Sequence, residues 1–457
     1  MDLFDEHTRA FEDWLVQAGV TASGKITLAD ARHRSAGRAV LAKEDISADE
    51  ELFSIPRSSI LTVETSDLPA DIKNKVSDPW LSLILVMFFE YQCGADSKWK
   101  AYFDVLPTAF DTLMYWTDQQ LDILQGSAVV NKIGKETADE TFNEQILPVV
   151  VEHVELFRAS GMSNTDILEV CHRMGSIIMA YAFDLERTDT AQNEQDGWEE
   201  DSDDGGQILP KGMVPLADML NADADRNNAK LFYEDDKVVM KTIVDVKQDE
   251  ELFNDYGPLP SADVLRRYGY VTENYKQYDV VEVSIDMIKS EAKEQLNMQD
   301  SDIDARTSYL DEQGVLDDSY DISRSTSEDG QFPDELRALL NILALPQFEF
   351  EKMLAKEKLP KPELSQGAVT LLSSLLVRRT SQYTGALFAP GVVHTHEMNV
   401  RRQMAAHVIN GEKEVLQQAI ASVQQLQDQA SKKRKADADN TKSTTAQSDK
   451  SKKLKAR

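Results

Sequence analysis

The sequence predicts an α+β protein in which two β-rich segments are separated by a helical insertion and followed by a mostly helical domain. Strand-like alternation is confined to two regions, before residue 57 and after residue 228, whereas helical periodicity dominates residues 66–185 and the chain beyond residue 275. A chain of 457 residues also exceeds one ordinary hydrophobic core, and its 41% hydrophobic content is typical of globular proteins. We therefore predict two domains with a boundary near Tyr275.

The first β-rich segment begins with a short amphipathic helix, Phe4–Gly19, because its apolar residues recur at helical spacing. Two strands are predicted next, Gly37–Ile46 and Glu50–Pro56. The intervening Ser47-Ala-Asp is a turn sequence, which favours a β-hairpin.

The insertion, about residues 66–185, lacks strand alternation and carries helical patterns at Ile146–Ala159 and Asn164–Ala182. Its longest apolar run, Trp80 to Phe89, is well short of the roughly 20 residues that cross a bilayer. We predict a buried helix there and no membrane association.

Strand patterns return at Ala229–Glu234 and Lys237–Val244, with Asp235-Asp236 placed as a hairpin turn. A further strand is predicted at Asp279–Ile285. The second domain, 276–430, has helical periodicity at Leu336–Leu345, Gly367–Thr384 and Glu397–Gln427, and a polar, acidic loop at Asp311–Gln331.

The net charge of −31, with 28% charged residues, makes the surface strongly acidic. Nine acidic residues and one arginine fall between Glu186 and Asp204, and a disordered acidic loop is predicted at about 186–210. Such a field repels phosphate and attracts lysine-rich proteins, so nucleic acid is not expected as a direct ligand and a basic protein is. The alternative is that acidity only maintains solubility.

The last residues, 431–457, reverse this charge. They carry ten Lys or Arg and three Asp, a net +7, and are predicted to be disordered. Lys432-Lys-Arg-Lys and Lys450-Ser-Lys-Lys-Leu-Lys are separated by a polar spacer, which is typical of a signal for a nuclear import receptor. A nuclear location is the expectation, and a solubilising tail or a weak nucleic-acid arm is the alternative.

The cysteine and histidine content argues against disulfides and metal sites. Only Cys93 and Cys171 are present, which suits a reducing compartment, and His394 with His396 are taken as structural or surface residues. The acidic N-terminus, beginning Met1-Asp-Leu-Phe, lacks the pattern of a secretory signal. No metal cofactor is expected.

Two tyrosine-glycine pairs give the strongest functional signal. Asn221-Ala-Asp-Ala-Asp is followed by Asn254-Asp-Tyr-Gly and then by Arg267-Tyr-Gly-Tyr-Val. Glycine after Tyr256 and after Tyr268 predicts two sharp turns, each presenting a phenol where the backbone approaches a neighbour closely. Alone, these tyrosines would more often be core residues, and Asn221 a turn or cap residue.

The order of these motifs resembles the split SET methyltransferases typified by the Rubisco large-subunit lysine methyltransferase, and the resemblance covers nearly the whole chain. Met213-Val-Pro-Leu-Ala-Asp-Met-Leu-Asn-Ala-Asp and Leu265-Arg-Arg-Tyr-Gly-Tyr-Val are most similar to the fungal ribosomal branch of that family. The resemblance implies a β-rich SET domain of small sheets with a pseudoknot-like C-terminal closure, followed by a helical substrate-binding domain that includes Leu375–Leu387.

The resemblance also implies S-adenosyl-L-methionine as the methyl donor. The residues expected to contact this cofactor are Gly37, Arg38, Ala39, Tyr181, Asn221, Ala222 and Tyr256. Two positions depart from the family pattern, because Ala39 replaces a glycine and Ala222 replaces a histidine. A backbone contact at Ala39 survives the change where φ is negative. At Ala222, alanine suffices if the family's histidine offers mainly backbone groups; if its ring matters, cofactor affinity should fall or the methyl donor should be held differently.

Tyr256 and Tyr268 are the expected catalytic residues. A lysine must enter as a neutral amine, although its ordinary pKa is about 10.4, and must be aligned with the methyl group. A phenol with a pKa near 10 is poorly suited as a general base, so Tyr256 is assigned to positioning and Tyr268 to the lysine channel. Trp116, Asp184 and Asp218 are implied substrate contacts, since carboxylates attract a target lysine.

These features together predict a protein-lysine N-methyltransferase that monomethylates a lysine of a large-subunit ribosomal protein. Three alternatives remain open at this point. The target could be a lysine of a histone or transcription factor, or a histidine, or the altered Ala39 and Ala222 could leave a non-catalytic nuclear adaptor for basic proteins.

Overall fold

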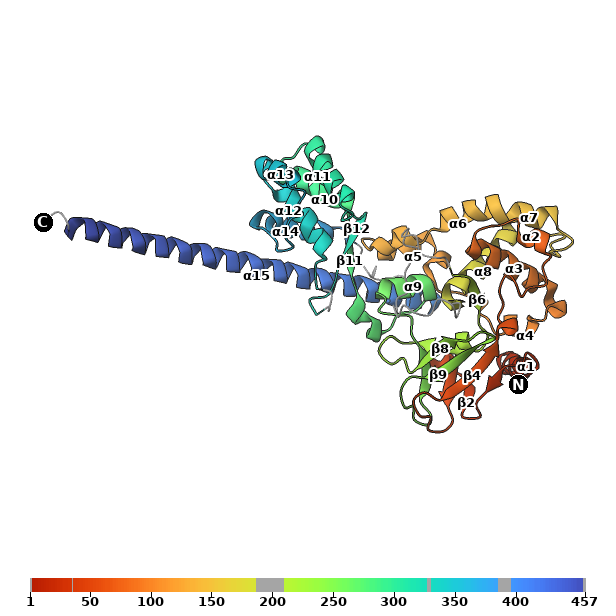
Figure 1. Cartoon of the computed structure of the whole chain (residues 1–457). Coiled ribbons are helices and arrows are strands. Elements are labelled where there is room, and N and C mark those ends of the chain that lie inside the picture. Colours follow the sequence, from red (N-terminus) through yellow and green to blue (C-terminus); the bar gives the residue numbers. More distant parts are fainter. Residues whose placement is uncertain (1, 35, 186–208, 327–329, 385–395, 455–457) are drawn as a thin grey trace. The chain divides into compact units, whose positions relative to one another are not determined.

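The structure, a computed structural model, describes residues 2–34, 36–185, 209–326, 330–384 and 396–454 (Figure 1). The chain forms two compact units. The first consists of Met1–Trp116, Asn131–Leu259 and Asp263–Tyr275, and the second of Thr117–Val130, Pro260–Ala262 and Lys276–Arg457. Two short segments, 117–130 and 260–262, thus group with the second unit although they precede the predicted boundary at Tyr275.

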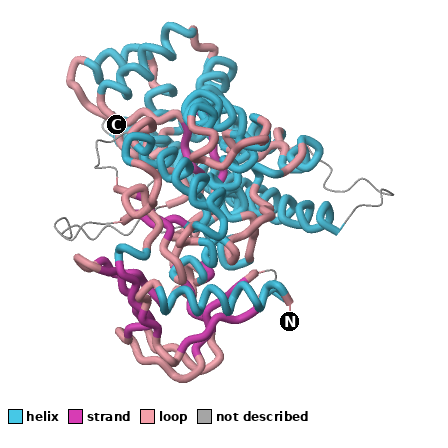
Figure 2. Tube along the Cα trace, turned by 90° about the vertical axis from the view of Figure 1, so that its right-hand side faces the viewer, coloured by secondary structure: helices cyan, strands magenta, loops and turns pink. Residues whose placement is uncertain are grey.

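Three small sheets build the first unit. The first has the order β1 (Thr21–Ala22), β4 (Glu51–Pro56), β9 (Lys237–Thr242), β8 (Ala229–Tyr233). The second has the order β2 (Ile26–Asp30), β3 (Arg38–Ala42), β10 (Glu251–Asn254), β7 (Asn221–Ala222), and the third pairs β5 (Ala182–Asp184) with β6 (Lys211–Met213). Helix α1 (Leu3–Gln17) lies beside the strands (Figure 2), held by Arg38, which donates to the Phe4 carbonyl oxygen at 3.3 Å.

The predicted hairpin between Gly37–Ile46 and Glu50–Pro56 is wrong. Both strands exist, but β3 pairs with β2 and β10, while β4 pairs with β1 and β9. Each strand is central and therefore has partners on both edges: one comes from residues 21–30 and the other from the segment after residue 220. The turn between them is fastened to that segment as well, because the Asp49 N–H donates to the Thr242 carbonyl at 3.0 Å. The second predicted hairpin is confirmed, since β8 and β9 pair antiparallel.

The insertion is helical, as predicted. Helix α3 (Pro79–Cys93) begins at Asp78, whose side chain accepts the Leu81 N–H, and its residues 81–90 are all buried, which confirms the buried helix. Helix α8 (Asn164–Tyr181) begins at a capping box formed by Ser163 and Asp166 and leads directly into β5. The shorter helices of this region are α2 (Ala70–Lys73), α4 (Lys100–Phe103), α6 (Lys135–Thr141) and α7 (Leu147–Glu152).

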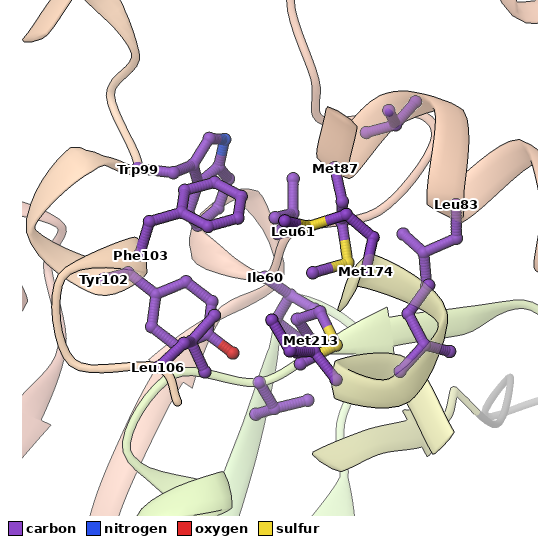
Figure 3. Close-up of a cluster of buried hydrophobic side chains, with 14 of the residues drawn as sticks. Ile60, Leu61, Leu83, Met87, Trp99, Tyr102, Phe103, Leu106, Met174 and Met213 are labelled. Atoms are coloured by element: carbon purple, nitrogen blue, oxygen red, sulfur yellow. The ribbon is translucent and has the colours of Figure 1, made fainter. Parts of the chain in front are cut away.

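The helix predicted at Ile146–Ala159 is shorter and starts in an unusual way. A π-helical turn, Phe142–Ile146, precedes α7, which ends at Glu152. Pro148 has no N–H to donate to the preceding turn, so the regular α-helical pattern is interrupted there. Figure 3 shows part of the core around α3, α4 and α8, where Tyr102 of α4 lies with Trp99, Phe103 and Leu106, and Met174 of α8 lies near Met213.

The second unit is mainly helical. Its helices are α5 (Asp118–Leu121), α10 (Ile285–Leu296), α11 (Asp300–Glu312), α12 (Asp334–Ala344), α13 (Gln347–Leu354), α14 (Gln366–Ser381) and α15 (His396–Leu454). The predicted strand appears as β11 (Val281–Ser284) and pairs with β12 (Ser319–Ile322), which lies where only a loop was expected. Helices α10, α11 and α13 were not predicted, because their polar residues mask the apolar stripe.

The basic tail also differs from expectation. The backbone of α15 continues as helix through Leu454, whereas a disordered tail was predicted from residue 431. Residues 431–454 contain no proline or glycine and are rich in alanine and lysine, which favour helix. The acidic loop was predicted at about 186–210, and its residues 186–208 lie outside the described residues. Within the described ranges, no helix is long and apolar enough to cross a membrane.

Candidate active site

Tyr256 and Tyr268 come together in the first unit. Tyr256 follows β10, and Tyr268 ends helix α9 (Ser261–Tyr268). Their rings stack with centroids 4.2 Å apart and planes at 12°. Gly257 and Gly269 both have φ of +76°, a conformation that favours glycine. A side chain at residue 269 would also lie 2.7 Å from the Thr112 nitrogen, so the turn after Tyr268 needs glycine for close packing.

The electrostatic surroundings keep both phenols neutral. Burial raises the pKa of Tyr256 well above 10, and the neighbouring Tyr268 and Tyr270 raise it further. Burial raises the pKa of Tyr268 to about 12, although Arg267, which hydrogen-bonds its hydroxyl, opposes the rise. The Tyr256 hydroxyl lies 3.5 Å from the Ala180 carbonyl oxygen, at the end of α8. A phenol with so high a pKa serves as a hydrogen-bond donor and positioning group, not as a general base.

A hollow adjoins the two rings, hereafter the tyrosine pocket. Its lining comes from the end of α8, from β5, from the segment before β7 and from the two tyrosine turns: Met179, Ala180, Tyr181, Ala182, Phe183, Ala217, Asp218, Asn254, Tyr256 and Tyr268. Four predicted site residues, Tyr181, Asp218, Tyr256 and Tyr268, therefore share one pocket. Burial raises the pKa of Tyr181 to about 12, and the negative charge of Asp218 adds to this rise, so this phenol is neutral too.

Asp218 is a buried carboxyl group with one unused oxygen. Tyr102 donates its hydroxyl proton to Oδ2, whereas Oδ1 is buried without a hydrogen-bond partner among the described residues. Burial raises the pKa of Asp218 to about 7, and the Tyr102 hydrogen bond, followed by the backbone N–H groups of Asp218 and Leu216, opposes that rise. The backbone two residues earlier is strained, because Leu216 has φ of +78°. Such a combination of strain and an unsatisfied buried carboxyl group is typical of a functional site.

The strand β3 carries Gly37, Arg38 and Ala39 at or beside its start. Gly37 is exposed with φ of +64°, and nothing lies within 4 Å of where its side chain would be. Ala39 is fully buried and has ordinary strand geometry, so its methyl group points into the core. Alanine in place of glycine at residue 39 therefore does not obstruct the open face beside Gly37.

Arg38 faces inward. Its guanidinium donates to the Val105 carbonyl at 2.9 Å and to the Thr8 hydroxyl at 3.0 Å, and it lies over the Phe4 ring. Burial lowers the pKa of Arg38. The backbone of Arg38, in contrast, is part of the site region, because its carbonyl accepts from the Asn221 amide at 3.3 Å.

Asn221 and Ala222 form β7, which pairs in parallel with β10. The Asn221 amide also donates to the Glu251 carboxylate at 2.7 Å, and this contact fixes its orientation. The turn role considered for Asn221 belongs to Asp223, which accepts the N–H groups of Asp225 and Arg226. Asn274 donates to Asp223 at 2.8 Å, so the C-terminal segment of the unit closes over this turn.

These residues fit S-adenosylmethionine. The open face at Gly37, the Arg38 and Ala222 backbone and the fixed Asn221 amide provide a cradle of main-chain groups, and neither alanine substitution fills it. Ala222 is half-buried in the β7–β10 pair, where backbone groups determine its contacts. The tyrosine pocket begins at Asn254, the β10 residue that pairs with Ala222.

The remaining predicted substrate contacts lie elsewhere. Trp116 is buried, and its indole N–H donates to the Asp111 carbonyl at 2.8 Å, so it supports the backbone against which Gly269 packs. The Asp184 carboxylate accepts from Lys211 at 2.8 Å, at the far end of β5. Neither residue lines the tyrosine pocket. In the part of the chain that the structure describes, no group of three or more potential ligands could hold a metal. His394 lies outside the described residues, as does the side chain of His396.

Sequence reasoning missed several residues of this region. Tyr102, Asn254, Tyr270 and Tyr275 surround the site, and burial raises the pKa of Tyr275 and of Tyr270. Tyr270 and Asn254 stand inside the quoted motifs and could have been found from them. Tyr102 lies 116 residues before Asp218, and no local pattern links the two.

Comparison with known proteins shows to which family this fold and site belong. The SET domain family matches residues 37–257. The chain is 33% identical to ribosomal lysine N-methyltransferase 4 of Saccharomyces cerevisiae over 367 residues, 76% of this chain and 73% of that protein. It is 25% identical to human N-lysine methyltransferase SETD6 over 422 residues, 84% of each chain.

Solved structures show the same fold. The SET domain of LSMT bound to lysine and AdoHcy matches with a TM-score of 0.67 at 19% identity, covering 92% of this chain and 91% of that one. Rubisco LSMT bound to AdoMet matches with the same TM-score and identity. Fold and site thus define a SET-domain methyltransferase. The chain belongs to the family of SET-domain protein lysine N-methyltransferases, for which S-adenosylmethionine is the methyl donor.

Proposed function

We propose that this enzyme adds a single methyl group to a lysine of a basic protein of the large ribosomal subunit. The observation that carries this proposal is the 33% identity to ribosomal lysine N-methyltransferase 4 of Saccharomyces cerevisiae, against 25% to human SETD6. A second ribosomal lysine N-methyltransferase 4, from Schizosaccharomyces pombe, is 26% identical over 359 residues.

Charge supports a basic substrate. The chain carries −31, so a lysine-rich ribosomal protein is attracted to it over long range, and salt weakens this attraction. At short range, the unused Oδ1 of Asp218 can accept a hydrogen bond from an amine that enters the tyrosine pocket. The net charge thus attracts a basic protein, and Asp218 offers a hydrogen-bond acceptor to its lysine amine.

The pocket residues prepare the amine. A lysine amine is unreactive while protonated, and a site walled by Tyr181, Tyr256 and Tyr268 disfavours the charged form through desolvation. Tyr256, whose raised pKa keeps it protonated, orients groups by donating a hydrogen bond, and the stacked rings exclude water. S-adenosylmethionine, when bound, supplies the methyl group and a positive sulfonium that also favours the neutral amine.

Hydrogen-bonding groups beside the reaction centre support a single methylation. The Tyr181, Tyr256 and Tyr268 hydroxyl groups belong to residues that line the pocket, and they can hold an amine through its remaining protons. Asp218 adds a hydrogen-bond acceptor that an unmethylated amine can use with more of its protons. A lysine of a histone or transcription factor is the second candidate target, and the similarity to human SETD6 favours it.

The decisive experiment combines binding with transfer. Calorimetry measures the affinity of purified enzyme for S-adenosylhomocysteine, and labelled S-adenosylmethionine is then offered with purified large-subunit proteins, with histones and with lysine-to-arginine controls. We expect label on one large-subunit protein and, by mass spectrometry, a mass gain of one methyl. Tyr256→Phe serves as the matched inactive enzyme. Label on histones alone would replace the ribosomal target, and multiple methyl groups would overturn monomethylation.

We also propose that the enzyme acts in the nucleus. The two basic clusters of residues 432–435 and 450–455 support recognition by an import receptor. Replacing the lysines and arginines of both clusters by glutamine should leave a fluorescently tagged enzyme in the cytoplasm, while the same replacement at Lys230 and Lys241, outside the tail, should not. Nuclear accumulation of the tail variant would contradict the proposal.

A further inference from the structure

A second hollow lies next to the tyrosine pocket and shares Met179 with it. It is lined by Thr112, Met114, Ile133, Ser176, Met179, Arg266 and Arg267. None of the residues that fit S-adenosylmethionine at β3 and β7 belongs to this lining. The hollow therefore extends the pocket on a side that the cofactor cradle does not occupy.

Thr112 gives the first indication of a ligand. Its side chain is 4% exposed, and its Oγ1 is buried without a hydrogen-bond partner among the described residues. A buried hydroxyl that makes no hydrogen bond is destabilising by about 1–3 kcal/mol, so such groups are retained mainly where something else satisfies them. A polar group of a ligand bound in this hollow is a candidate partner for this hydroxyl.

The two arginines give the second indication. Arg266 pairs with Asp263 on the same helix at 3.0 Å, and its side chain is only 13% exposed. Arg267 hydrogen-bonds the Tyr268 hydroxyl. The residues that line the hollow thus include two arginines and no aspartate or glutamate, on a chain whose net charge is −31. This reversal of sign is local and lies beside the catalytic phenols.

Donors of this kind fit one ligand chemistry. A carboxylate accepts hydrogen bonds from a hydroxyl and from guanidinium groups, and Arg is especially suited to it. The apolar walls formed by Met114, Ile133 and Met179 suit one or two methylene groups next to that carboxylate. Glutamate has this composition, and aspartate is its shorter form.

We propose that this hollow is a subsite for an acidic side chain, glutamate or aspartate, that lies near the target lysine in the substrate. The proposal rests on the proposed lysine methylation and adds a sequence requirement to it. The acidic surface then selects a basic protein, while the subsite selects, among its lysines, one with a carboxylate beside it.

The test uses short peptides with one central lysine and, at each of the three positions on either side, glutamate, glutamine or lysine. For wild-type enzyme we expect kcat/KM to be about tenfold higher with glutamate than with glutamine at one of these positions, equal to about 1.4 kcal/mol. Calorimetric affinities of the same peptides, measured with S-adenosylhomocysteine present, should show the same preference without any turnover.

Two variants and one control show whether the preference for glutamate over glutamine arises in this hollow. Thr112→Val removes the hydroxyl at nearly constant volume, and Arg266→Gln removes one guanidinium; in each, the glutamate-to-glutamine ratio should fall from about ten toward one. Arg337→Gln is the matched control, because Arg337 pairs with Asp334 three residues earlier at 3.1 Å, as Arg266 does with Asp263, but on α12. The control should retain the full ratio.

The outcomes separate the two proposals. Methylation of lysine peptides with equal kcat/KM and equal affinity for glutamate and glutamine would overturn the subsite and leave the methyltransferase intact. If no peptide is methylated, the calorimetric ratios alone decide the subsite. Weaker binding of S-adenosylhomocysteine by Thr112→Val and Arg266→Gln, with an unchanged peptide ratio, would assign the carboxylate to the cofactor and overturn the substrate subsite.

Discussion

Asp218 in the first unit and Glu412 in the second are both buried carboxyl groups that accept a hydrogen bond from a tyrosine, yet only one has its two oxygens satisfied. Ser127 donates to Glu412 Oε1 at 2.6 Å, and Tyr383 donates to Oε2 at 2.6 Å. Asp218 has Tyr102 on Oδ2 and no described partner on Oδ1. Burial raises the pKa of Asp218 and of Glu412 to about 7.

The difference predicts a structural role for Glu412 and a functional role for Asp218. Glu412 lies on α15 and links residue 127 with the segment just after α14. Each of its two carboxyl oxygens already accepts a hydrogen bond from one of these segments. Asp218 keeps an oxygen in the tyrosine pocket, held there by strained backbone at Leu216. Equal pKa values therefore do not imply equal roles. Hydrogen-bond satisfaction decides between them.

The largest expected effect is on kcat, and it comes from removing one phenol hydroxyl in each unit. Tyr256→Phe should lower kcat by roughly 100-fold or more, because a positioned donor is lost from the reaction centre. Its affinity for S-adenosylhomocysteine, measured by calorimetry, should stay within about twofold. Tyr383→Phe, the matched change at Glu412, should leave kcat on a peptide unchanged. Full activity of Tyr256→Phe would remove this residue from the mechanism.

The next effect concerns the carboxyl groups themselves. Asp218→Asn should lower kcat/KM about tenfold at pH 8, since a neutral amide replaces the charge that faces the amine. Glu412→Gln should not change kcat/KM on a peptide. Loss of activity in Glu412→Gln, with a folded protein by circular dichroism, would contradict the distinction drawn between the two sites.

The stability of the Asp218→Asn variant should rise, whereas its activity should fall. A carboxyl group whose folded pKa is raised destabilises the protein above that pKa, and the effect disappears as pH falls to its ordinary value near 4. Asp218→Asn should thus raise the melting temperature at pH 8, by about 3 °C per kcal/mol recovered, and by less at pH 5. Differential scanning fluorimetry at the two pH values measures this. An equal shift at both would show that Asp218 is not ionised at pH 8.

A smaller effect is expected for Tyr102→Phe. The hydrogen bond from Tyr102 lowers the pKa of Asp218, so its removal should move the acid limb of the pH profile of kcat/KM to higher pH by about one unit. The maximal rate at high pH should change less. A purely structural role for Tyr102 would lower the melting temperature without moving that limb.

The smallest effect is expected at Ala39, where Ala39→Gly restores the residue usual in the family. Its methyl group is buried in β3, so affinity for S-adenosylhomocysteine should change by less than about twofold. Stability should fall by about 1 kcal/mol, because glycine weakens a strand and loses a buried methyl. A large gain in affinity would show that residue 39 faces the cofactor.

The sequence predicted the parts of the site that lie within local motifs. Tyr256 and Tyr268 were recognisable because each precedes a glycine, and both glycines do adopt positive φ. Asp218 and Asn221 were found through the segment that contains both. Tyr102 and Thr112 were not, since their roles depend on contacts with residues more than a hundred positions away.

The fold was predictable in its elements and less so in its pairing. The long apolar run of α3 and the hairpin β8–β9 follow directly from local patterns. Strands β3 and β4 were assigned to each other because they are neighbours in sequence, whereas both needed partners from beyond residue 228. Short polar helices such as α11 escaped detection, because only some of their residues, including Ile303 and Leu310, are buried.

The segment Thr117–Val130 has a practical consequence for anyone who wishes to study the two units apart. It lies within the sequence of the first unit but folds with the second, where Gln120 accepts from Arg401 at 3.0 Å and Ser127 donates to Glu412. A fragment that ends at Tyr275 would carry this segment away from both partners and expose Leu124 and Val129, which are otherwise buried. Truncation and limited proteolysis would therefore damage both halves, and internal replacement of residues 117–130 by a polar linker is the better route to an isolated catalytic unit.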